Sequence, residues 1–248
     1  MPYAPRRRAP RPRLLASAPR GRRIGPRRRT SRTRRAAIGA FASVALVCAG
    51  YLGWEFIGTN VVARQHQHRA ISALLGAWDR KAPSVTADGV AVDAIIRIPR
   101  FGPGYSVPVV EGTSSRSLGM GVGHVIGSAR PGAPGNVVLA GHRVTHGEPF
   151  RSLPSLRSGD EVIIETLTTG YVYRVASGAS ASRRVPDTSS WVLASSPQDP
   201  TRVHISRPGA RRLITLITCA ELFHTSDRLV VFGELVRTYP RVLPHPEA

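Results

Sequence analysis

An uncharged run of 19 residues, Ala36–Trp54, constrains this chain more than any other feature of its sequence. About 20 apolar residues in a helix rise ~30 Å, which matches the hydrocarbon core of a bilayer. Glu55 is the first charge after the run, and the rings of Tyr51 and Trp54 near its end favour a membrane interface. We therefore expect residues 36–58 to be a transmembrane anchor. A cleavable signal peptide is the competing interpretation, but its apolar stretch is usually shorter, and a small-residue cleavage site is not obvious here.

The segment before this run is strongly basic. Residues 1–35 contain 14 arginines and no acidic residue, so they carry most of the formal net charge of +20. Charge repulsion, prolines and few apolar groups predict a disordered tail. Basic residues beside an apolar segment stay in the cytoplasm, so we expect a single-pass plasma-membrane protein with its remainder outside the cell. Arginines also attract nucleic acid or acidic lipid. Membrane orientation accounts for the tail, however, and we expect no nucleic-acid partner.

The remainder of the chain divides into three parts by its pattern. Residues 59–89 are polar and mixed, with apolar side chains at helical spacing within Val61–Trp78, and we interpret them as a stalk and linker. Residues 90–240 contain short β-branched runs separated by Gly, Pro and Asp, which predicts a folded domain rich in strands. Residues 241–248 form a short C-terminal tail.

The expected domain belongs to the all-β class. Thr168–Gly170 is a plausible hairpin turn between two of its strands. Strands at this spacing favour a mainly antiparallel sandwich or barrel. The runs that predict strands are Val92–Ile98, Asn136–Ala140, Glu161–Thr166, Tyr171–Val175, Leu213–Thr218 and Leu229–Val236.

One of the two cysteines is a candidate nucleophile. Cys48 lies in the apolar segment and Cys219 lies far downstream, so we expect no disulfide between them. Cys219 closes the apolar run Leu213–Cys219, and the end of a buried strand can hold a thiol in position at a cleft. For a lone cysteine, a buried structural role is the commoner alternative.

Two further residues give Cys219 a chemical context. Arg228 lies nine residues later, at the start of the next predicted strand, so two antiparallel strands would bring the two side chains together. A guanidinium there would stabilise an oxyanion and favour the thiolate. His142 follows another predicted strand and would exchange protons with the thiol if the fold brings them together. The alternatives are an exposed arginine paired with Asp227 or Glu221, and a surface histidine.

The spacing of His142, His146 and Glu148 also raises the possibility of a metal site. Two histidines four residues apart lie on one face of a helix, which is a zinc-binding arrangement. The glycines and the proline in this segment oppose a helix, and the ligand set is incomplete for zinc. We therefore expect no metal and no cofactor.

Together these motifs resemble the sortases, the membrane-anchored cysteine transpeptidases of Gram-positive bacteria. The resemblance covers about Asp93 to Tyr239, and its details are most similar to class E, the housekeeping type of many high-GC actinobacteria. The segment Ala220–His224 departs from the small polar or proline-containing stretch that many such enzymes have after the cysteine. The principal motifs are Gly141-His142-Arg143, Thr215-Leu216-Ile217-Thr218-Cys219 and Arg228. Secondary matches are Ile98-Pro99, Pro108-Val109-Val110-Glu111-Gly112, Gly121-Val122-Gly123-His124, Pro134-Gly135-Asn136 and Gly159-Asp160.

The resemblance implies an eight-stranded closed β-barrel with short helices, preceded by one transmembrane helix. It implies cleavage of a C-terminal sorting signal, of the Leu-Pro-X-Thr-Gly or Leu-Ala-X-Thr-Gly type, after its Thr. The acyl-enzyme on Cys219 would then pass to an amine of a peptidoglycan precursor or a pilin. His142 would serve as the acid and base, and Arg228 would stabilise the oxyanion. The partners are therefore secreted proteins that carry the signal, together with the acceptor amine.

Other functions fit the sequence less well. Papain-like and cell-wall amidase enzymes place their Cys before their His, the reverse of the order of His142 and Cys219 here. The Ser-His-Gly-Cys signature of L,D-transpeptidases is absent. A hydrolytic or non-catalytic surface-anchored barrel is the remaining alternative, and the presence of all three candidate residues argues against the non-catalytic form.

Overall fold

The computed structural model describes residues 30–176, 182–197, 211–219 and 226–241. The chain forms two compact units, Met1–Cys48 and Ala49–Ala248. Residues 1–29 of the expected basic tail, residues 242–248 of the expected C-terminal tail and Ala220–His224 lie outside the described residues.

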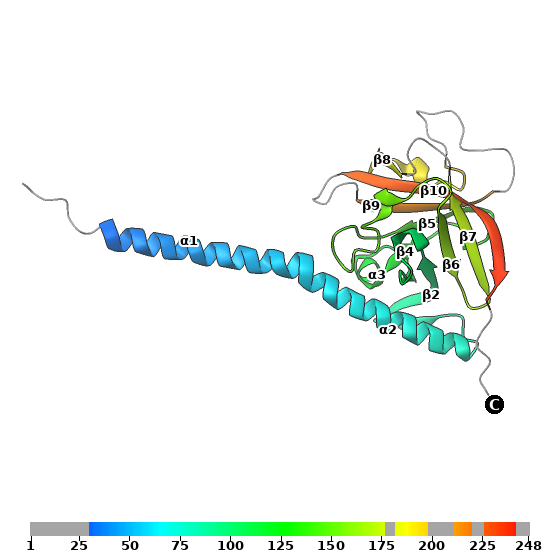
Figure 1. Ribbon diagram of the computed structural model, residues 1–248, viewed down its shortest axis with the longest axis horizontal. Helices are drawn as coiled ribbons and strands as arrows, with labels where there is room; N and C mark the ends of the chain where they lie inside the picture. The colour runs from blue at the N-terminus through cyan, green and yellow to red at the C-terminus, as the bar shows by residue number, and fades with distance from the viewer. Residues whose placement is uncertain (1–29, 177–181, 198–210, 220–225, 242–248) are drawn as a thin grey trace, which may run out of the picture. The chain divides into compact units, whose positions relative to one another are not determined.

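The apolar segment is helical, as expected. Helix α1 (Thr30–Gly53) begins before the uncharged run, and its described part therefore includes the last residues of the expected disordered tail (Figure 1). Large apolar side chains on it are exposed, among them Phe41, Leu46 and Val47. In the described chain, one helical stretch, Ser31–Asp79, has a window long and apolar enough to cross a membrane, a property that signal sequences share. The apolar helix therefore fits a membrane anchor.

The second unit contains the expected closed barrel. Eight of the described strands form a ring in the order β2-β3-β4-β5-β9-β10-β7-β6, and the pairing of β6 with β2 closes it (Figure 1). The β3–β4 and β5–β9 pairs are parallel, and the other pairs are antiparallel. The ring strands are β2 (Val90–Arg97), β3 (Val107–Glu111), β4 (Val122–His124), β5 (Gly135–Ala140), β6 (Glu161–Glu165), β7 (Thr169–Val175), β9 (Arg212–Cys219) and β10 (Asp227–Pro240).

Two more described strands extend the ring without joining it. Strand β1 (Val85–Ala87) pairs with β2, and β8 (Ser182–Pro186) pairs with β10. All six strands expected from the sequence are present. Strands β1, β3, β4 and β8 were not expected, because they are short and two of them contain proline, which weakens the sequence signal for a strand. The expected hairpin joins β6 to β7, but its turn lies two residues earlier, so that Thr169 and Gly170 belong to β7.

The barrel interior is filled by side chains that alternate along the strands. Val137 and Leu139 of β5 and Ile214 and Leu216 of β9 all lie in this core and are nearly or fully buried. Because successive side chains of a strand point to opposite faces, the residues between them face outward. This parity places the candidate catalytic residues on the outer side of the barrel wall.

The segment interpreted as a stalk, residues 59–89, instead forms part of the folded unit. Helix α2 (Thr59–Asp79) follows the π-helical turn Trp54–Gly58 and buries Leu74 and Trp78 completely in a cluster with β2 and β3. Apolar residues recur at helical spacing on α2 because one face of this helix covers the barrel. Helix α3 (Ser115–Met120), capped by the Ser114 hydroxyl, packs beside it.

Candidate active site

Cys219 and Arg228 are direct neighbours across two strands. Cys219 ends β9 as a free, half-buried thiol, and its register partner on β10 is Arg228. Side chains of directly paired residues lie on the same face of a sheet, about 4.5–5.5 Å apart at their Cβ atoms. The thiol and the guanidinium therefore share the outer face of the barrel, as the sequence predicted.

The guanidinium of Arg228 contacts both backbone and carboxylate oxygens. Its Nη1 donates to the Asp227 carbonyl at 3.3 Å, and its Nη2 lies 4.0 Å from an Asp187 carboxylate oxygen. The side chain of Asp227 lies 3.4 Å from Arg184. The side chain of Arg228 is 36% exposed.

His142 lies at the end of the strand that flanks β9 on its other side. The parallel β5–β9 pair continues beyond Ala140, because the Gly141 amide donates to the Ile217 carbonyl at 3.0 Å. The hydroxyl of Thr218 donates to the Gly141 carbonyl at 2.8 Å. These bonds tie the backbone just before His142 to the backbone just before Cys219.

The glycine that precedes His142 is required by space. A Cβ at Gly141 would lie 2.8 Å from the ring of Phe150, which is fully buried. Gly141 therefore faces the core, and the alternation of the strand places His142 on the outer side with Cys219. The Phe150 amide donates to the His142 carbonyl at 3.0 Å and fixes this turn.

Arg143 is a second guanidinium at this site, and the sequence reasoning did not single it out. Its Nη1 donates to the Cys219 carbonyl at 3.4 Å. The available signal was its place in the Gly-His-Arg motif, directly after the candidate histidine. This contact joins the end of β9 to the loop after β5.

A groove lined by both aliphatic and polar side chains continues from Arg228 along the outer face. This groove has a volume of about 230 Å³, and a second cavity on the same unit has a volume of about 380 Å³. Ile217, Val192 and Leu193 line the groove together with Arg228 and the polar residues Asp187, Thr188, Ser189 and Ser190. Its wall is the short 3-10 helix Ser190–Leu193. Asn136, almost fully buried, holds that wall by donating to the carbonyls of Val192 and Ala194 at 3.1 and 3.0 Å.

Comparison with known proteins identifies the family of this chain. A family model described as a sortase domain matches residues 96–236. This chain belongs to the sortase family. The sortase is 34% identical over 218 residues to sortase SrtE1 of Streptomyces coelicolor, covering 84% of this chain and 58% of that protein. It is 30% identical over 233 residues to SrtE2 of the same organism, covering 86% and 87%.

Solved structures agree with this assignment. Sortase E from Streptomyces avermitilis has 37% identity and a TM-score of 0.52, covering 60% of this chain and 90% of that one. Sortase E1 from Streptomyces coelicolor, solved with a tripeptide in the active site, has 35% identity and a TM-score of 0.52, covering 62% and 93%. The resemblance to class E expected from the sequence thus agrees with these relatives.

In this sortase the imidazole of His142 is neutral at pH 7. Partial burial, and next the nearby His146, lower the pKa of His142 from 6.5 to about 4. The two rings are stacked, with centroids 4.7 Å apart. Two adjacent cations would repel, and a desolvated cation loses its hydration, so both effects favour the neutral ring. His142 therefore has an unprotonated ring nitrogen at neutral pH, although the lowered pKa makes it a weaker base than a free imidazole.

The possible metal site at His142, His146 and Glu148 finds no support in the geometry. The Glu148 carboxylate accepts from Arg151 and from Asn60, each at 2.8 Å, and His146 Nδ1 lies 2.9 Å from the Thr145 hydroxyl. Among the described residues, no group of three His, Cys, Asp or Glu side chains is placed to hold a metal ion.

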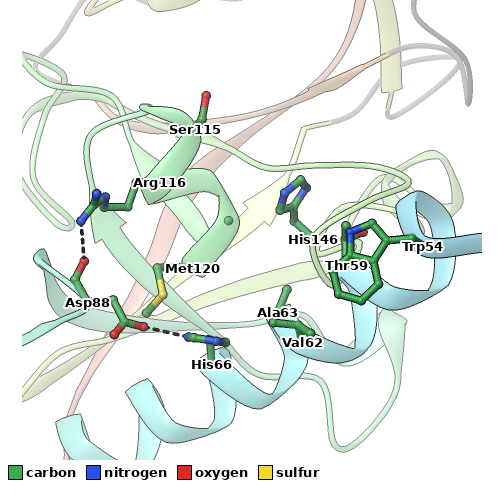
Figure 2. Close-up of a pocket in the computed structure, with 11 residues that line it drawn as sticks. Trp54, Thr59, Val62, Ala63, His66, Asp88, Ser115, Arg116, Met120 and His146 are labelled. Atoms are coloured by element: carbon green, nitrogen blue, oxygen red, sulfur yellow. Dashed lines mark hydrogen bonds and ion pairs between the residues drawn. The ribbon is translucent and has the colours of Figure 1, made fainter. Parts of the chain in front are cut away.

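His146 also lines the larger cavity, which lies beside α2 and α3 (Figure 2). The apolar part of its wall includes Trp54, Val62 and Met120. At its rim His66 Nδ1 lies 2.7 Å from an Asp88 carboxylate oxygen. This cavity shares no lining residue with the groove at Arg228, so the two cavities are distinct.

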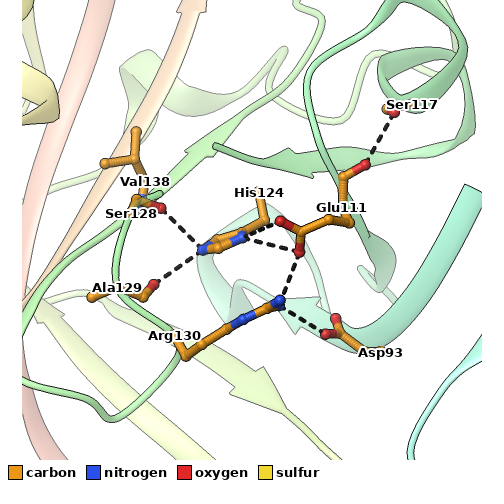
Figure 3. A network of polar contacts seen from close by, with 8 residues as sticks. All are labelled: Asp93, Glu111, Ser117, His124, Ser128, Ala129, Arg130 and Val138. Atoms are coloured by element: carbon orange, nitrogen blue, oxygen red, sulfur yellow. Dashed lines mark hydrogen bonds and ion pairs between the residues drawn. The ribbon is translucent and has the colours of Figure 1, made fainter. Parts of the chain in front are cut away.

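A network of polar side chains surrounds His124 in the second unit (Figure 3). The ring of His124, 4% exposed, contacts the Glu111 carboxylate through Nδ1 at 3.3 Å and the Ala129 carbonyl through Nε2 at 3.0 Å. Arg130 bridges Glu111 and Asp93 at 2.9 and 3.1 Å. Both ring nitrogens have partners and the ring is buried, so we interpret this cluster as a structural support for β3 and β4.

We predict that the pKa of His142 lies near 4. His146→Ala removes the second cause of the depression, so the pKa of His142 should rise. It should stay below 6.5 because burial persists. NMR titration of the imidazole resonances measures both values. An unchanged His142 pKa in His146→Ala would show that the stacked ring has no electrostatic effect.

Proposed function

We propose that this sortase is a membrane-anchored cysteine transpeptidase. Its substrate would be a C-terminal sorting signal of the Leu-Pro-X-Thr-Gly or Leu-Ala-X-Thr-Gly type, cleaved after Thr. The acyl group would pass to an amine of a peptidoglycan precursor or a pilin. The observation that carries this proposal is the cross-strand pair of Cys219 and Arg228, with the loop of His142 tied to the same strand end.

The first half of the reaction follows from the charge states. Cys219 transfers its proton to the neutral imidazole of His142, and the thiolate attacks the Thr carbonyl carbon. Arg228 donates to the oxyanion that develops on the carbonyl oxygen. The imidazolium then protonates the Gly amine as the peptide bond breaks, which leaves a thioester on Cys219.

The second half reverses these steps with a different amine. The incoming amine gives a proton to His142 and attacks the thioester carbonyl, and Arg228 again meets the oxyanion. Collapse of this intermediate forms the new amide bond and expels the Cys219 thiolate. The imidazolium of His142 returns its proton to the thiolate, and the enzyme is restored.

The groove next to Arg228 suits the apolar first residue of the signal. Ile217, Val192 and Leu193 present aliphatic surface, and they lie on the same outer face as the thiol. A leucine side chain placed there would be removed from water, which favours binding. We infer that this groove selects the signal and directs its Thr carbonyl toward Cys219.

The apolar helix α1 supports a membrane location for the reaction. We infer that residues 36–58 cross the plasma membrane and that the 14 arginines of residues 1–35 stay in the cytoplasm. The catalytic unit would then lie outside the cell, where secreted proteins and cell-wall amines meet.

Substitution of the three proposed catalytic residues should separate their roles. Cys219→Ala should abolish peptide cleavage and amine transfer, because the variant lacks the nucleophile that forms the acyl-enzyme. His142→Ala should lower kcat by at least about 10²-fold, and Arg228→Ala by about 10²–10³-fold. Arg228→Lys should recover little, because a point charge lacks the planar fork. Mass spectrometry of a signal peptide incubated with an amine measures both products.

Cys48→Ala and Arg237→Ala are the matched controls for these variants, since both residues lie outside the proposed site and are exposed. Both should keep full activity. Loss of activity on chelation together with a harmless Arg228→Ala would contradict the assigned roles.

Leu193→Ala should weaken selection for leucine in the signal. The side chain lines the groove and is 45% exposed, so its removal costs contact area with little effect on the core. We expect kcat/KM for a Leu-containing peptide to fall by about tenfold. A peptide with Ala in place of that Leu should show no further loss in the variant. Ile126→Ala, an exposed apolar side chain outside the groove, is the control. Equal losses for both peptides would place the leucine elsewhere.

Membrane orientation is testable in intact cells. With a tag at each end of the chain, protease added outside should remove the C-terminal tag and spare the N-terminal one. Immunoblotting against both tags measures this. Protection of the C-terminal tag would overturn the proposed topology.

A further inference from the structure

Two buried amide side chains on α2 have no part in the proposed chemistry. Asn60 is 5% exposed and Gln67 is 6% exposed. Burying a polar side chain costs free energy unless it is hydrogen-bonded, so the contacts of these amides show what the helix holds. Neither residue falls within the 96–236 region that matches the sortase family.

Asn60 binds the loop that follows His142 at three points. Its Nδ2 donates to the Val144 carbonyl at 3.0 Å and to the Glu148 carboxylate at 2.8 Å. Its Oδ1 accepts from the Gly147 amide at 2.7 Å. One side chain on α2 therefore fixes the segment Val144–Glu148 by its backbone and by a carboxylate.

Gln67, two turns further along the helix, adds a fourth contact. Its Nε2 donates to the His146 carbonyl at 3.2 Å. A Cβ at Gly147 would lie 2.6 Å from the same nitrogen, so the loop passes directly over the amide. The two amides thus bracket the peptide units on both sides of Gly147.

The loop needs such support because its backbone is strained. His146, Gly147 and Glu148 have φ values of 54°, 83° and 53°, in the left-handed region. Residues other than glycine adopt this region at a cost and keep it only where the surroundings impose it. The bonds from Asn60 and Gln67 are the surroundings that the structure provides.

The strained loop in turn holds the imidazole of His142. The ring of His146 stacks on that of His142 at 4.7 Å, with 23° between the planes. Val144, bound by Asn60, is two residues from His142. A shift of the loop would therefore move the ring that accepts and donates the proton.

We propose that Asn60 and Gln67 are positioning residues, through which α2 fixes the loop Val144–Glu148 and so the imidazole of His142 against Cys219. This inference rests on the proposed role of His142. The helix that follows the apolar anchor in the chain is thus a working part of the catalytic unit. A displacement of about 1 Å in a catalytic group costs up to about 10²-fold in rate, so the effect on kcat is large.

The principal test compares Asn60→Leu with the matched control Gln65→Leu in the full-length chain in detergent. Leucine has a similar size to asparagine and makes no hydrogen bond, whereas Gln65 is exposed on the same helix. Asn60→Leu should lower kcat for signal-peptide cleavage by about tenfold to 10²-fold. KM should change by less than about threefold, because no residue of α2 lines the groove at Arg228. Gln65→Leu should match the wild type.

A second readout separates positioning from general destabilisation. Release of the loop exposes the ring of His142 and moves His146 away, and both changes raise the pKa of His142 from about 4 toward 6.5. The NMR titration of Asn60→Leu should show this rise while its far-UV circular dichroism stays that of the wild type. A variant that is only less stable keeps the low pKa in its folded fraction.

A charge exchange tests the contact itself. Asn60→Asp keeps the acceptor for the Gly147 amide but loses both donors and places a second carboxylate beside Glu148. Its kcat should fall at least as far as that of Asn60→Leu. Adding Glu148→Gln removes the repulsion between the two carboxylates and supplies a donor. The kcat of the double variant should therefore be about tenfold higher than that of Asn60→Asp.

The outcomes distinguish this inference from the proposed function. If His142→Ala is inactive but Asn60→Leu and Gln67→Leu keep wild-type kcat and His142 pKa, the positioning role is wrong and the proposed function stands. If His142→Ala is active, the proposed function itself fails. If Asn60→Leu does not fold, Gln67→Leu and the charge exchange serve as the test. The inference is then overturned if Gln67→Leu keeps wild-type kcat and Glu148→Gln fails to raise the kcat of Asn60→Asp.

Discussion

The register of β9 between its two neighbours is the constraint on which the site depends. On one side the antiparallel pairing with β10 sets Cys219 opposite Arg228, and on the other the parallel pairing with β5 brings Gly141 beside Thr218. Side chains alternate along a strand, so a slip of one residue would turn the thiol into the barrel core. Ile214 and Leu216 prevent that slip, because they are buried in the interior and would become exposed.

The same alternation separates stability from chemistry. Inward residues of β5 and β9 form the core, while outward residues form the groove and carry the thiol. The outer face is itself supported by polar contacts, since Thr215 donates to Asn136 at 2.9 Å and Asn136 holds the wall of the groove. In the proposed function, this fixed floor and wall would bind the signal peptide with little further ordering cost.

Helix α2 shows how a segment outside the ring becomes part of the folded unit. Its apolar face covers β2 and β3, and this packing fixes the position of the helix and the direction in which its other side chains point. With the helix fixed, Asn60 and Gln67 reach a loop that is more than 75 residues away in the chain. That loop carries His146, whose ring stacks on that of His142 and adds to the effect of burial in lowering the pKa of His142.

Local pattern was enough for much of this protein. The uncharged run specified the apolar helix, and the β-branched runs specified six strands, because these signals depend only on neighbours in the chain. The motifs around His142, Cys219 and Arg228 indicated the family. Short strands such as β4, and β8 with its polar residues, carry too little local signal and form because neighbouring strands pair with them. Tertiary packing alone decided that residues 59–89 join the fold, because burial of Trp78 and Leu74 requires the faces that β2 and β3 present once the barrel has formed. It alone brought Asn60 to the loop after His142, since nothing in a sequence of 248 residues marks one amide as the partner of a loop 84 residues later.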